Sequence, residues 1–432
     1  MKISEQLEAL RLGVVDLAVW LDTICELIEK QDDKIRALLS DSYDRSGILL
    51  QADRLLRDFP NVEDRPLLFG LPVGVKDIFR VDGFPTRCGA KLPPSLFEGA
   101  EASSVTRLKQ AGAIIIAKTV TTEFACFQPG PTRNPHHLEH TPGGSSSGSA
   151  AGVSMGFFPL ALGTQTVGSI IRPAAYCGVI GFKPSFGRIA GDGVIPVSHS
   201  VDHVGFFCTD ISGLSIVATI LISDWKTQMN QPDMGTVAAG IPEGPYLIQS
   251  SQNAREHFER VIGQLKENGM SVVHCRVLAN IEAINECHTK IMLAEMARVH
   301  GEWYRDFKDL YAPMTAEMIQ KGLKIDDGEL KQLVIQRDAN RQQIAQQMDD
   351  HGIDFWLTPA ATDHAPKGLS STGNPIMNLP WTHTGMPTVS IPCGFDSAGL
   401  PHGLQIVGRF GEDEALVGFG EVISQTIVKT GT

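Results

Sequence analysis

The feature that most constrains the fold of this chain is a long stretch without charged side chains. Between Glu139 and Arg172 there is no Asp, Glu, Lys or Arg. Glycine and serine concentrate there in two turns, at 143–148 and 163–169, with small and apolar residues between them. Its prolines and many Gly, Ser and Thr residues make it too polar for an apolar membrane helix of about 20 residues. We therefore expect buried core that brings two serine-bearing turns to one nearly neutral site.

Size and charge narrow the class of protein. The chain has 432 residues, more than the roughly 250–300 at which a single core usually stops growing. A formal charge of −12 gives no general attraction to nucleic acid or to an acidic membrane surface. The N-terminus is charged throughout and lacks the apolar core of a signal peptide. We expect a cytoplasmic α/β protein with a small-molecule partner, and leave a homodimer open.

The cysteines and histidines do not suggest a metal site. Eight cysteines are scattered without CxxC or Cys/His ligand spacing, so we expect reduced, buried thiols. His136, His137 and His140 cluster in a loop, but no HExxH or matching carboxylate pattern accompanies them, and His203 is given no role. The sequence thus predicts neither a metal nor an organic cofactor.

Periodicity and glycine punctuation predict alternating helices and strands. Helices are expected over 4–39, with a break at Gly13, over 103–110, and through most of the charged segment 280–350. A helix followed by a strand is expected within 253–275. Further strands are expected at 67–81, 113–118, 355–360, 388–393 and 404–408.

Three familiar catalytic or nucleotide motifs are excluded. The segment GSSSG at 144–148 fits the GxSxG pattern of a nucleophile elbow, but the preceding NPHHLEHTPG is nothing like a strand. No GxxxxGK[ST] occurs, and no GxGxxG follows a predicted strand. A nucleophile elbow at Ser146, a phosphate loop and a dinucleotide fold therefore have little support.

Three segments together resemble the amidase signature family: LPVGVKD at 71–77, PGGSSSGSAA at 142–151 and GTQTVGSIIRPAAYCGVIGFKPSFGR at 163–188. Weaker similarity continues through KTVTTEFA, RNP, LTPA, GMPTVSIP and GLPHGLQIVG. The resemblance implies one large α/β domain over 1–432, with a central mixed β-sheet flanked by helices. We expect a core at about 67–215, a helical and α/β subdomain at about 226–350, and a segment 351–432 that returns to the core sheet.

The resemblance also implies a Ser–Ser–Lys triad. It makes Ser169 the nucleophile, Ser145 the bridging serine 24 positions upstream, and Lys76 the base, and it implies a cis peptide bond before Ser145. The physical chemistry agrees, because burial away from carboxylates lowers the pKa of a lysine and makes it a usable base. Asp77 is adjacent, but on a strand its side chain would point to the opposite face.

Four main-chain N–H groups are candidates to hold the oxyanion, those of Thr166, Val167, Gly168 and Ser169. Two departures from the family pattern lie in this turn. Most relatives have Gly where this chain has Val167, and many have Asp where it has Gln165. We expect these changes to affect the rate and the substrate size more than the chemistry.

Substrate contacts are predicted less sharply. Arg172 lies three residues after Ser169 and could clamp a substrate carboxylate, or it could form a buried ion pair. Ser146 either assists the bridging serine or, like Ser147, stiffens the loop. Trp381, with Thr382 and Met386, either lines the acyl pocket or packs in the core.

The predicted activity is that of an amidase (EC 3.5.1-type) that hydrolyses a small linear amide through an acyl-enzyme. One alternative is the glutaminase subunit of a tRNA-dependent amidotransferase, for which the chain looks short. Another is a non-catalytic binding protein on the same fold. Retention of Lys76, Ser145 and Ser169 disfavours that last hypothesis.

Overall fold

A computed structural model describes residues 2–227, 232 and 235–430. Ten strands in this part of the chain form one sheet with the order β2-β1-β3-β5-β4-β9-β10-β8-β6-β7. The strands are β1 Pro72–Lys76, β2 Ile114–Thr119, β3 Leu160–Gln165, β4 Ile180–Lys183, β5 His203–Cys208, β6 Ala238–Pro242, β7 Ser271–Cys275, β8 Phe355–Pro359, β9 Thr388–Phe395 and β10 Pro401–Val407.

The sheet is mixed. At one end β1 pairs in parallel with β2 and β3, and at the other β6 pairs in parallel with β7 and β8. The five central pairings, from β3–β5 through β10–β8, are antiparallel. The last two strands of the chain thereby join its two parallel ends.

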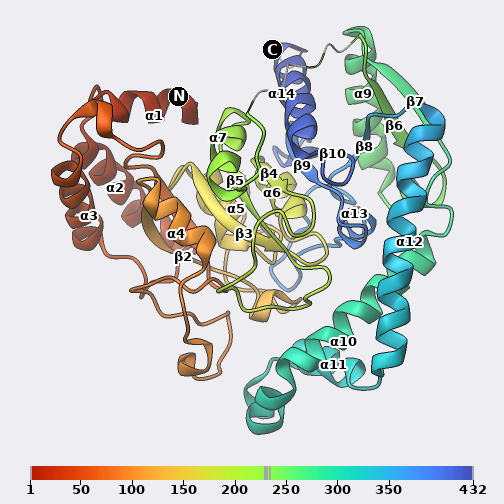
Figure 1. Ribbon diagram of the computed structural model, residues 1–432, viewed down its shortest axis with the longest axis horizontal. Helices are drawn as coiled ribbons and strands as arrows, with labels where there is room; N and C mark the ends of the chain where they lie inside the picture. Colours follow the sequence, from red (N-terminus) through yellow and green to blue (C-terminus); the bar gives the residue numbers. More distant parts are fainter. Residues whose placement is uncertain (1, 228–231, 233–234, 431–432) are drawn as a thin grey trace.

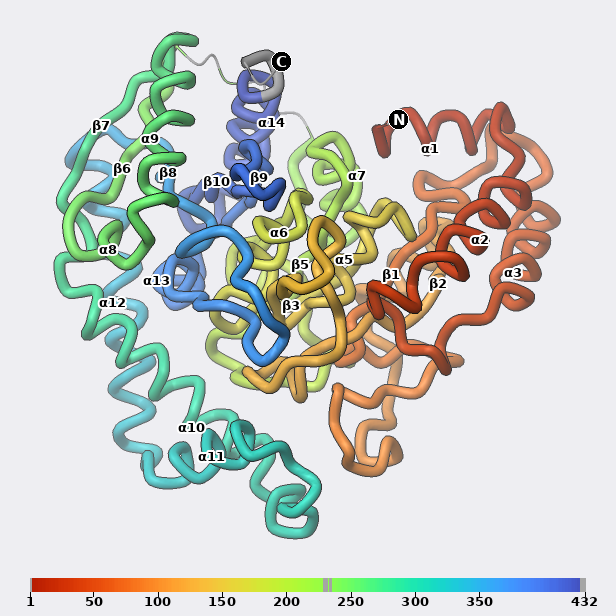
Figure 2. Tube along the Cα trace, turned by 180° about the vertical axis from the view of Figure 1, so that it is seen from behind, coloured from red at the N-terminus to blue at the C-terminus, as the bar shows by residue number. Residues whose placement is uncertain are grey.

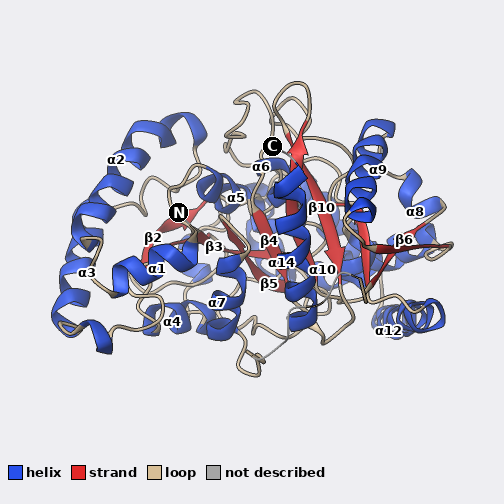
Figure 3. Cartoon of the chain, turned by 90° about the horizontal axis from the view of Figure 1, so that it is seen from above, coloured by secondary structure: helices blue, strands red, loops and turns tan. Residues whose placement is uncertain are grey.

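Helices cover both faces of the sheet, which Figure 3 shows as a central layer of strands. The described residues form α1 Ile3–Arg11, α2 Leu17–Ile35, α3 Arg45–Asp58, α4 Ser103–Gln110, α5 Ser147–Ser154, α6 Ile171–Cys177, α7 Ser212–Leu221, α8 Pro245–Ile248, α9 Gln252–Glu267, α10 Ile281–Phe307, α11 Pro313–Gly322, α12 Asp327–His351, α13 Leu379–His383 and α14 Asp413–Thr430. The predicted α/β fold with one mixed, helix-flanked sheet is confirmed.

Two hydrophobic cores lie on the two faces of the sheet, because successive strand residues point to opposite sides. In β2, Ile114 and Ile116 pack in one core and Ile115 in the other. The first core includes α2, α3, α5 and α6, and the second includes α4, α7, α9 and α10. The charge-free stretch is buried almost throughout, as predicted.

The later helices lie around one side of the sheet. α10 and α11 extend beyond the sheet and α12 runs back toward it (Figure 1). Seen from behind, the C-terminal segment with α13 lies between α8–α9 and α5–α6 (Figure 2). The expected boundary at about 226 is followed by 228–231 and 233–234, which lie outside the described residues.

Several predicted elements are confirmed, with shorter bounds in places. α4, α9, β7, β8, β9 and β10 lie where they were expected, and 4–39 divides into α1 and α2 around Gly13. The expected strand 67–81 is wrong outside Pro72–Lys76, since turns flank it.

No described helix is long and apolar enough to cross a bilayer. All eight cysteines are buried and free, as expected.

Candidate active site

Lys76 is the last residue of β1 and its ammonium group is completely buried. Its Nζ lies 2.7 Å from Ser145 Oγ and 2.7 Å from Thr164 Oγ1. Thr164 belongs to β3, the strand beside β1 in the sheet. The strand pairing therefore holds the lysine between two hydroxyl groups.

Burial lowers the pKa of Lys76 to about 7, and the nearby Asp202 carboxylate opposes this shift. Asp77 does not approach the lysine: its carboxylate accepts a hydrogen bond from Lys118 Nζ at 2.8 Å in a buried ion pair. The prediction that Asp77 points away from Lys76 is thus confirmed. A lysine with this pKa is substantially neutral at physiological pH and can accept a proton.

The first glycine turn presents Ser145 to the lysine. The Gly144–Ser145 peptide bond is cis, as the family resemblance implied. Ser147 Oγ donates to the Gly143 carbonyl at 2.9 Å, which ties the turn to the start of α5. Ser146 Oγ instead donates to the Thr164 carbonyl at 3.2 Å. Ser146 therefore anchors the turn to β3.

The second turn links β3 to α6 and carries Ser169. Within the described chain, none of the main-chain N–H groups of Thr166, Val167, Gly168 and Ser169 donates a hydrogen bond. Ser169 Oγ likewise has no hydrogen-bond partner there, and no bond joins it to Ser145. The turn thus offers one free hydroxyl and four free N–H donors, which is what an acyl-transfer site requires.

A narrow pocket with a free volume of about 10 Å³ adjoins this turn. Ser169, Thr166 and Val167 contribute to its wall, and Arg172 is the one charged residue among those that line it. The other walls are largely apolar and come from Ala125, Cys126, Phe127, Val197, Met292 and Pro375. Since Met292 lies on α10, the helical segment helps to close the pocket.

Arg172 is buried near the start of α6. Its Nη2 donates to the Gly144 carbonyl at 2.6 Å and to Thr372 Oγ1 at 3.1 Å, and its Nη1 donates to the Gly373 carbonyl at 2.7 Å. No ion pair joins Arg172 to a carboxylate of the described chain, and its Nε–H has no partner. The alternative of a buried ion pair is therefore wrong for this chain.

Comparison with known proteins fits this geometry. The family model "Amidase" matches residues 20–417. The chain belongs to the amidase family. It is 30% identical to one subunit of the glutamyl-tRNA(Gln) amidotransferase of Geobacter sp. (strain M21), over 96% of this chain and 94% of that protein.

Solved structures agree in fold with this amidase. A crystal structure of an amidase, 29% identical, superposes with a TM-score of 0.89 over 100% of this chain and 99% of the other. The peptide amidase of Stenotrophomonas maltophilia, 22% identical, shares the fold with a TM-score of 0.84 over 99% and 97% of the two chains. The prediction of an amidase-type hydrolase is confirmed at the level of the family.

For three residues the sequence left open an acyl pocket or core packing, and none of them lines the pocket beside Ser169 in this amidase. Trp381 is fully buried and its indole N–H donates to the Tyr246 hydroxyl at 2.8 Å, so it packs in the core. Met386 is buried as well, and its carbonyl accepts from Lys183. Thr382 contacts the oxyanion turn instead of the pocket, because its Oγ1 donates to the Val167 carbonyl at 2.6 Å.

Two side chains that interact with Lys76 were missed by sequence reasoning. Thr164 lies within GTQT, but a threonine in a strand is ordinary and gives no signal of its own. Asp202 accepts hydrogen bonds from Thr166 Oγ1 at 2.6 Å and from the main chain at 197 and 198. Its distance in sequence from Lys76 concealed the charge interaction between them.

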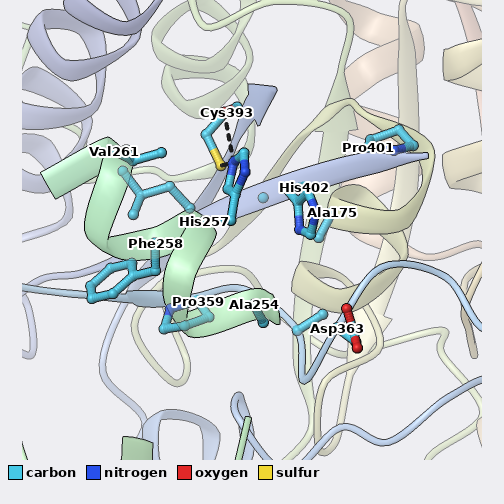
Figure 4. A pocket seen from close by; sticks show the side chains of 13 residues that line it. Ala175, Ala254, His257, Phe258, Val261, Pro359, Asp363, Cys393, Pro401 and His402 are labelled. Carbon is cyan, nitrogen blue, oxygen red and sulfur yellow. Dashed lines mark hydrogen bonds between the residues drawn. The ribbon is translucent and has the colours of Figure 1, made fainter. Parts of the chain in front are cut away.

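Two further pockets of the described chain differ in how close they lie to the site. The larger, of about 400 Å³, includes Thr164, Asp202 and Val197 in its wall, so it adjoins the lysine end of the site. The other lies between α9, β9 and β10, where His257 stacks on His402 (Figure 4). None of the predicted catalytic residues lines that second pocket. The described residues contain no group of His, Cys, Asp and Glu arranged for a metal ion.

Proposed function

We propose that this chain hydrolyses a small linear amide to a carboxylate and ammonia or a small amine, through an acyl-enzyme on Ser169. The observation that carries the proposal is the buried contact of 2.7 Å between Lys76 Nζ and Ser145 Oγ. Burial lowers the pKa of Lys76 to about 7, which suits a base that works near neutral pH.

In the proposed mechanism, neutral Lys76 takes the proton of Ser145 while Ser145 takes the proton of Ser169. Ser169 Oγ then forms a bond to the amide carbon, and the carbonyl oxygen becomes an oxyanion. As the carbon–nitrogen bond breaks, the proton returns through Ser145 to the leaving nitrogen. Water then attacks the ester by the same relay, which releases the carboxylate and restores Ser169. The free hydroxyl of Ser169 must turn toward Ser145 for the first step.

The oxyanion is assigned to the main-chain N–H groups of Thr166, Val167, Gly168 and Ser169. Their lack of other acceptors supports this assignment. Preorganised donors stabilise a developing charge because they need no reorientation during the reaction, and one such donor is typically worth about 3–4 kcal/mol. Val167 retains the N–H that this function needs.

The proposed substrate carries a small acyl group with a carboxylate. The pocket beside Ser169 is narrow, with a free volume of only about 10 Å³, roughly that of one water site, so it favours a small acyl group. Arg172 lies in its wall without an acidic partner, and its Nε–H is unpaired. A buried cation of this kind favours an anionic ligand. Ser146 and Trp381 are not proposed as substrate contacts, since their polar groups bind β3 and Tyr246.

Matched substrates test the contribution of Arg172. Arg172→Met should raise KM for an amide that bears a carboxylate much more than for its neutral analogue. Because Arg172 also holds the Gly144 carbonyl, some loss on both substrates is expected. The informative quantity is the ratio of the two losses, and equal losses would exclude a carboxylate contact.

The second candidate is the glutamyl-tRNA(Gln) amidotransferase activity for which several relatives are named. The relatives match over about their full length, so the expectation that this chain is too short for that activity is not supported. Co-purification of partner chains, with glutamine hydrolysis that depends on them, would favour this candidate. Ammonia release from small amides by the isolated chain favours the first one.

The third candidate, a binding protein without activity, is tested by covalent labelling. A fluorophosphonate probe should label the wild-type protein and fail to label Ser169→Ala. Absence of labelling in both would remove the proposed mechanism.

We propose a cytoplasmic location, which eight unpaired cysteines support because thiols stay reduced there.

A further inference from the structure

The Val167 carbonyl has an unusual partner for a group beside a nucleophile. It accepts a hydrogen bond of 2.6 Å from Thr382 Oγ1, a side chain 215 positions away in the sequence. This carbonyl belongs to the same planar peptide unit as the N–H of Gly168, and in a trans peptide the two groups point in opposite directions. A group that fixes the direction of this carbonyl therefore also fixes the direction of the Gly168 N–H.

Thr382 is itself held by Gln165. The side-chain oxygen of Gln165, Oε1, accepts from the main-chain N–H groups of Ile170 at 2.8 Å and Ile171 at 2.9 Å. Its Nε2 donates to Thr382 Oγ1 at 2.9 Å. The two N–H donors set the orientation of the amide, because only its oxygen can accept from them.

The amide gives the hydrogen bonds one direction. The Thr382 hydroxyl accepts a hydrogen bond from Gln165 Nε2. Since a hydroxyl has a single proton, that proton remains available to donate to another acceptor. The Val167 carbonyl at 2.6 Å is nearer than the Asn378 carbonyl at 3.1 Å. The direction thus runs from Gln165 through Thr382 to the Val167 carbonyl, and consecutive bonds of this kind strengthen one another.

A carboxylate at position 165 would reverse this arrangement. It can accept from Ile170 and Ile171, but it has no proton for Thr382 and would accept the threonine proton itself. The Val167 carbonyl would then lose its donor, and the Val167–Gly168 peptide would lose the contact that fixes its direction. The neutral amide of Gln165 therefore does more than remove one negative charge, because it makes Thr382 donate to the Val167 carbonyl in the oxyanion turn.

We propose that Gln165 and Thr382 are positioning residues that hold the Val167–Gly168 peptide with its N–H directed at the oxyanion. This inference rests on the proposed function, since it requires Ser169 to be the nucleophile. Both side chains are completely buried and neither lines the pocket, so they act through the turn and not on the substrate.

The test measures the second-order rate at which a fluorophosphonate labels Ser169, together with kcat and KM for an amide. Thr382→Val keeps the shape and removes the hydroxyl, and Gln165→Glu keeps the size and reverses the hydrogen bond. Both should slow labelling and kcat by about 10- to 100-fold with little change in KM, because loss of an oxyanion donor acts on the transition state. Thr382→Ser should restore most of the rate.

The controls separate this inference from its alternatives. Rates are compared on the high-pH plateau, so that a shifted titration of Lys76 does not contribute. Melting temperatures show whether each variant is folded, and Gln165→Glu carries the test if Thr382→Val does not fold. Wild-type rates in folded Thr382→Val or Gln165→Glu protein would overturn the inference. Absence of labelling in the wild type would instead overturn the proposed function.

Discussion

Thr164 Oγ1 and Ser145 Oγ both lie 2.7 Å from Lys76 Nζ, so the lysine is held by a hydroxyl from the strand and a hydroxyl from the glycine turn. Only Ser145 belongs to the predicted triad. Thr164 holds the Lys76 amine in position but transfers no proton in the proposed relay. The rate should therefore depend on a residue that only positions the base.

Thr164→Val should lower kcat/KM by about 10- to 100-fold, because a hydrogen bond to a charged or titrating group contributes about 1.5–3 kcal/mol. Thr164→Ser keeps the hydroxyl and should stay close to the wild type. Steady-state kinetics on the two variants decides the point. Equal losses in both would show that the methyl group matters and not the hydrogen bond.

The activity should rise with pH as Lys76 loses its proton. Since burial lowers the pKa of Lys76 to about 7, kcat/KM should increase through pH 7 and level off about one unit above it. Lys76→Ala should abolish turnover and leave the circular dichroism spectrum unchanged. A flat profile from about pH 6 to 9 would contradict the assignment of Lys76 as the base.

Asp202 should set the midpoint of that rise. Its carboxylate favours the ammonium form and so raises the pKa of Lys76 against the larger effect of burial. Asp202→Asn should therefore move the midpoint to lower pH, since the amide keeps one accepting oxygen and loses the charge. Asp192→Asn, at an exposed aspartate, is the control and should leave the midpoint in place. A shift of the midpoint to higher pH in Asp202→Asn would show that the Asp202 carboxylate does not raise the pKa of Lys76.

The buried pair of Lys118 and Asp77 should matter for stability. Lys118→Met leaves the Asp77 carboxylate buried without its cation, which typically costs about 3–5 kcal/mol. Lys118→Met combined with Asp77→Asn removes both charges and should be less destabilised than the single variant. Urea unfolding measures the three free energies. A double variant that is as unstable as the single one would show that charge is not the cause.

The buried side chain of Lys183 should make the stability of the protein depend on pH. Burial lowers its pKa to about 7, and Asp413 opposes the shift. The unfolded chain binds this proton more tightly, so the free energy of unfolding should rise above pH 7, by up to about 1.4 kcal/mol per pH unit. Lys183→Met should lose this contribution between about pH 7 and 8.5. Parallel pH profiles of the two proteins in denaturant unfolding would refute it.

Much of the catalytic arrangement could be predicted because it is written in short motifs. The order and spacing of the segments around Lys76, Ser145 and Ser169 identified the residues, and the physics of a buried lysine supplied the base. Residues that act across the fold carried no such signal. Thr382 reaches Val167 only because α13 packs against the β3–α6 turn, a contact that follows from the tertiary structure.

Three of the strands that were not predicted share a physical cause. β3, β4 and β5 are buried on both faces, so they lack the alternation of polar and apolar residues that marks a strand at the surface. Gly163, Gly181 and Gly205 also interrupt them. The order of the sheet could not be predicted either, because it depends on which strand edges remain free once the earlier strands have paired.

The position of β9 and β10 has a consequence for synthesis on the ribosome. β9 pairs with β4 and β10 pairs with β8, so these late strands join β4, which is made much earlier, to β8. A nascent chain that ends before residue 388 leaves one edge of β4 and one edge of β8 open to wrong partners. The growing polypeptide thus stays exposed to chaperones and aggregation until nearly all of it has emerged.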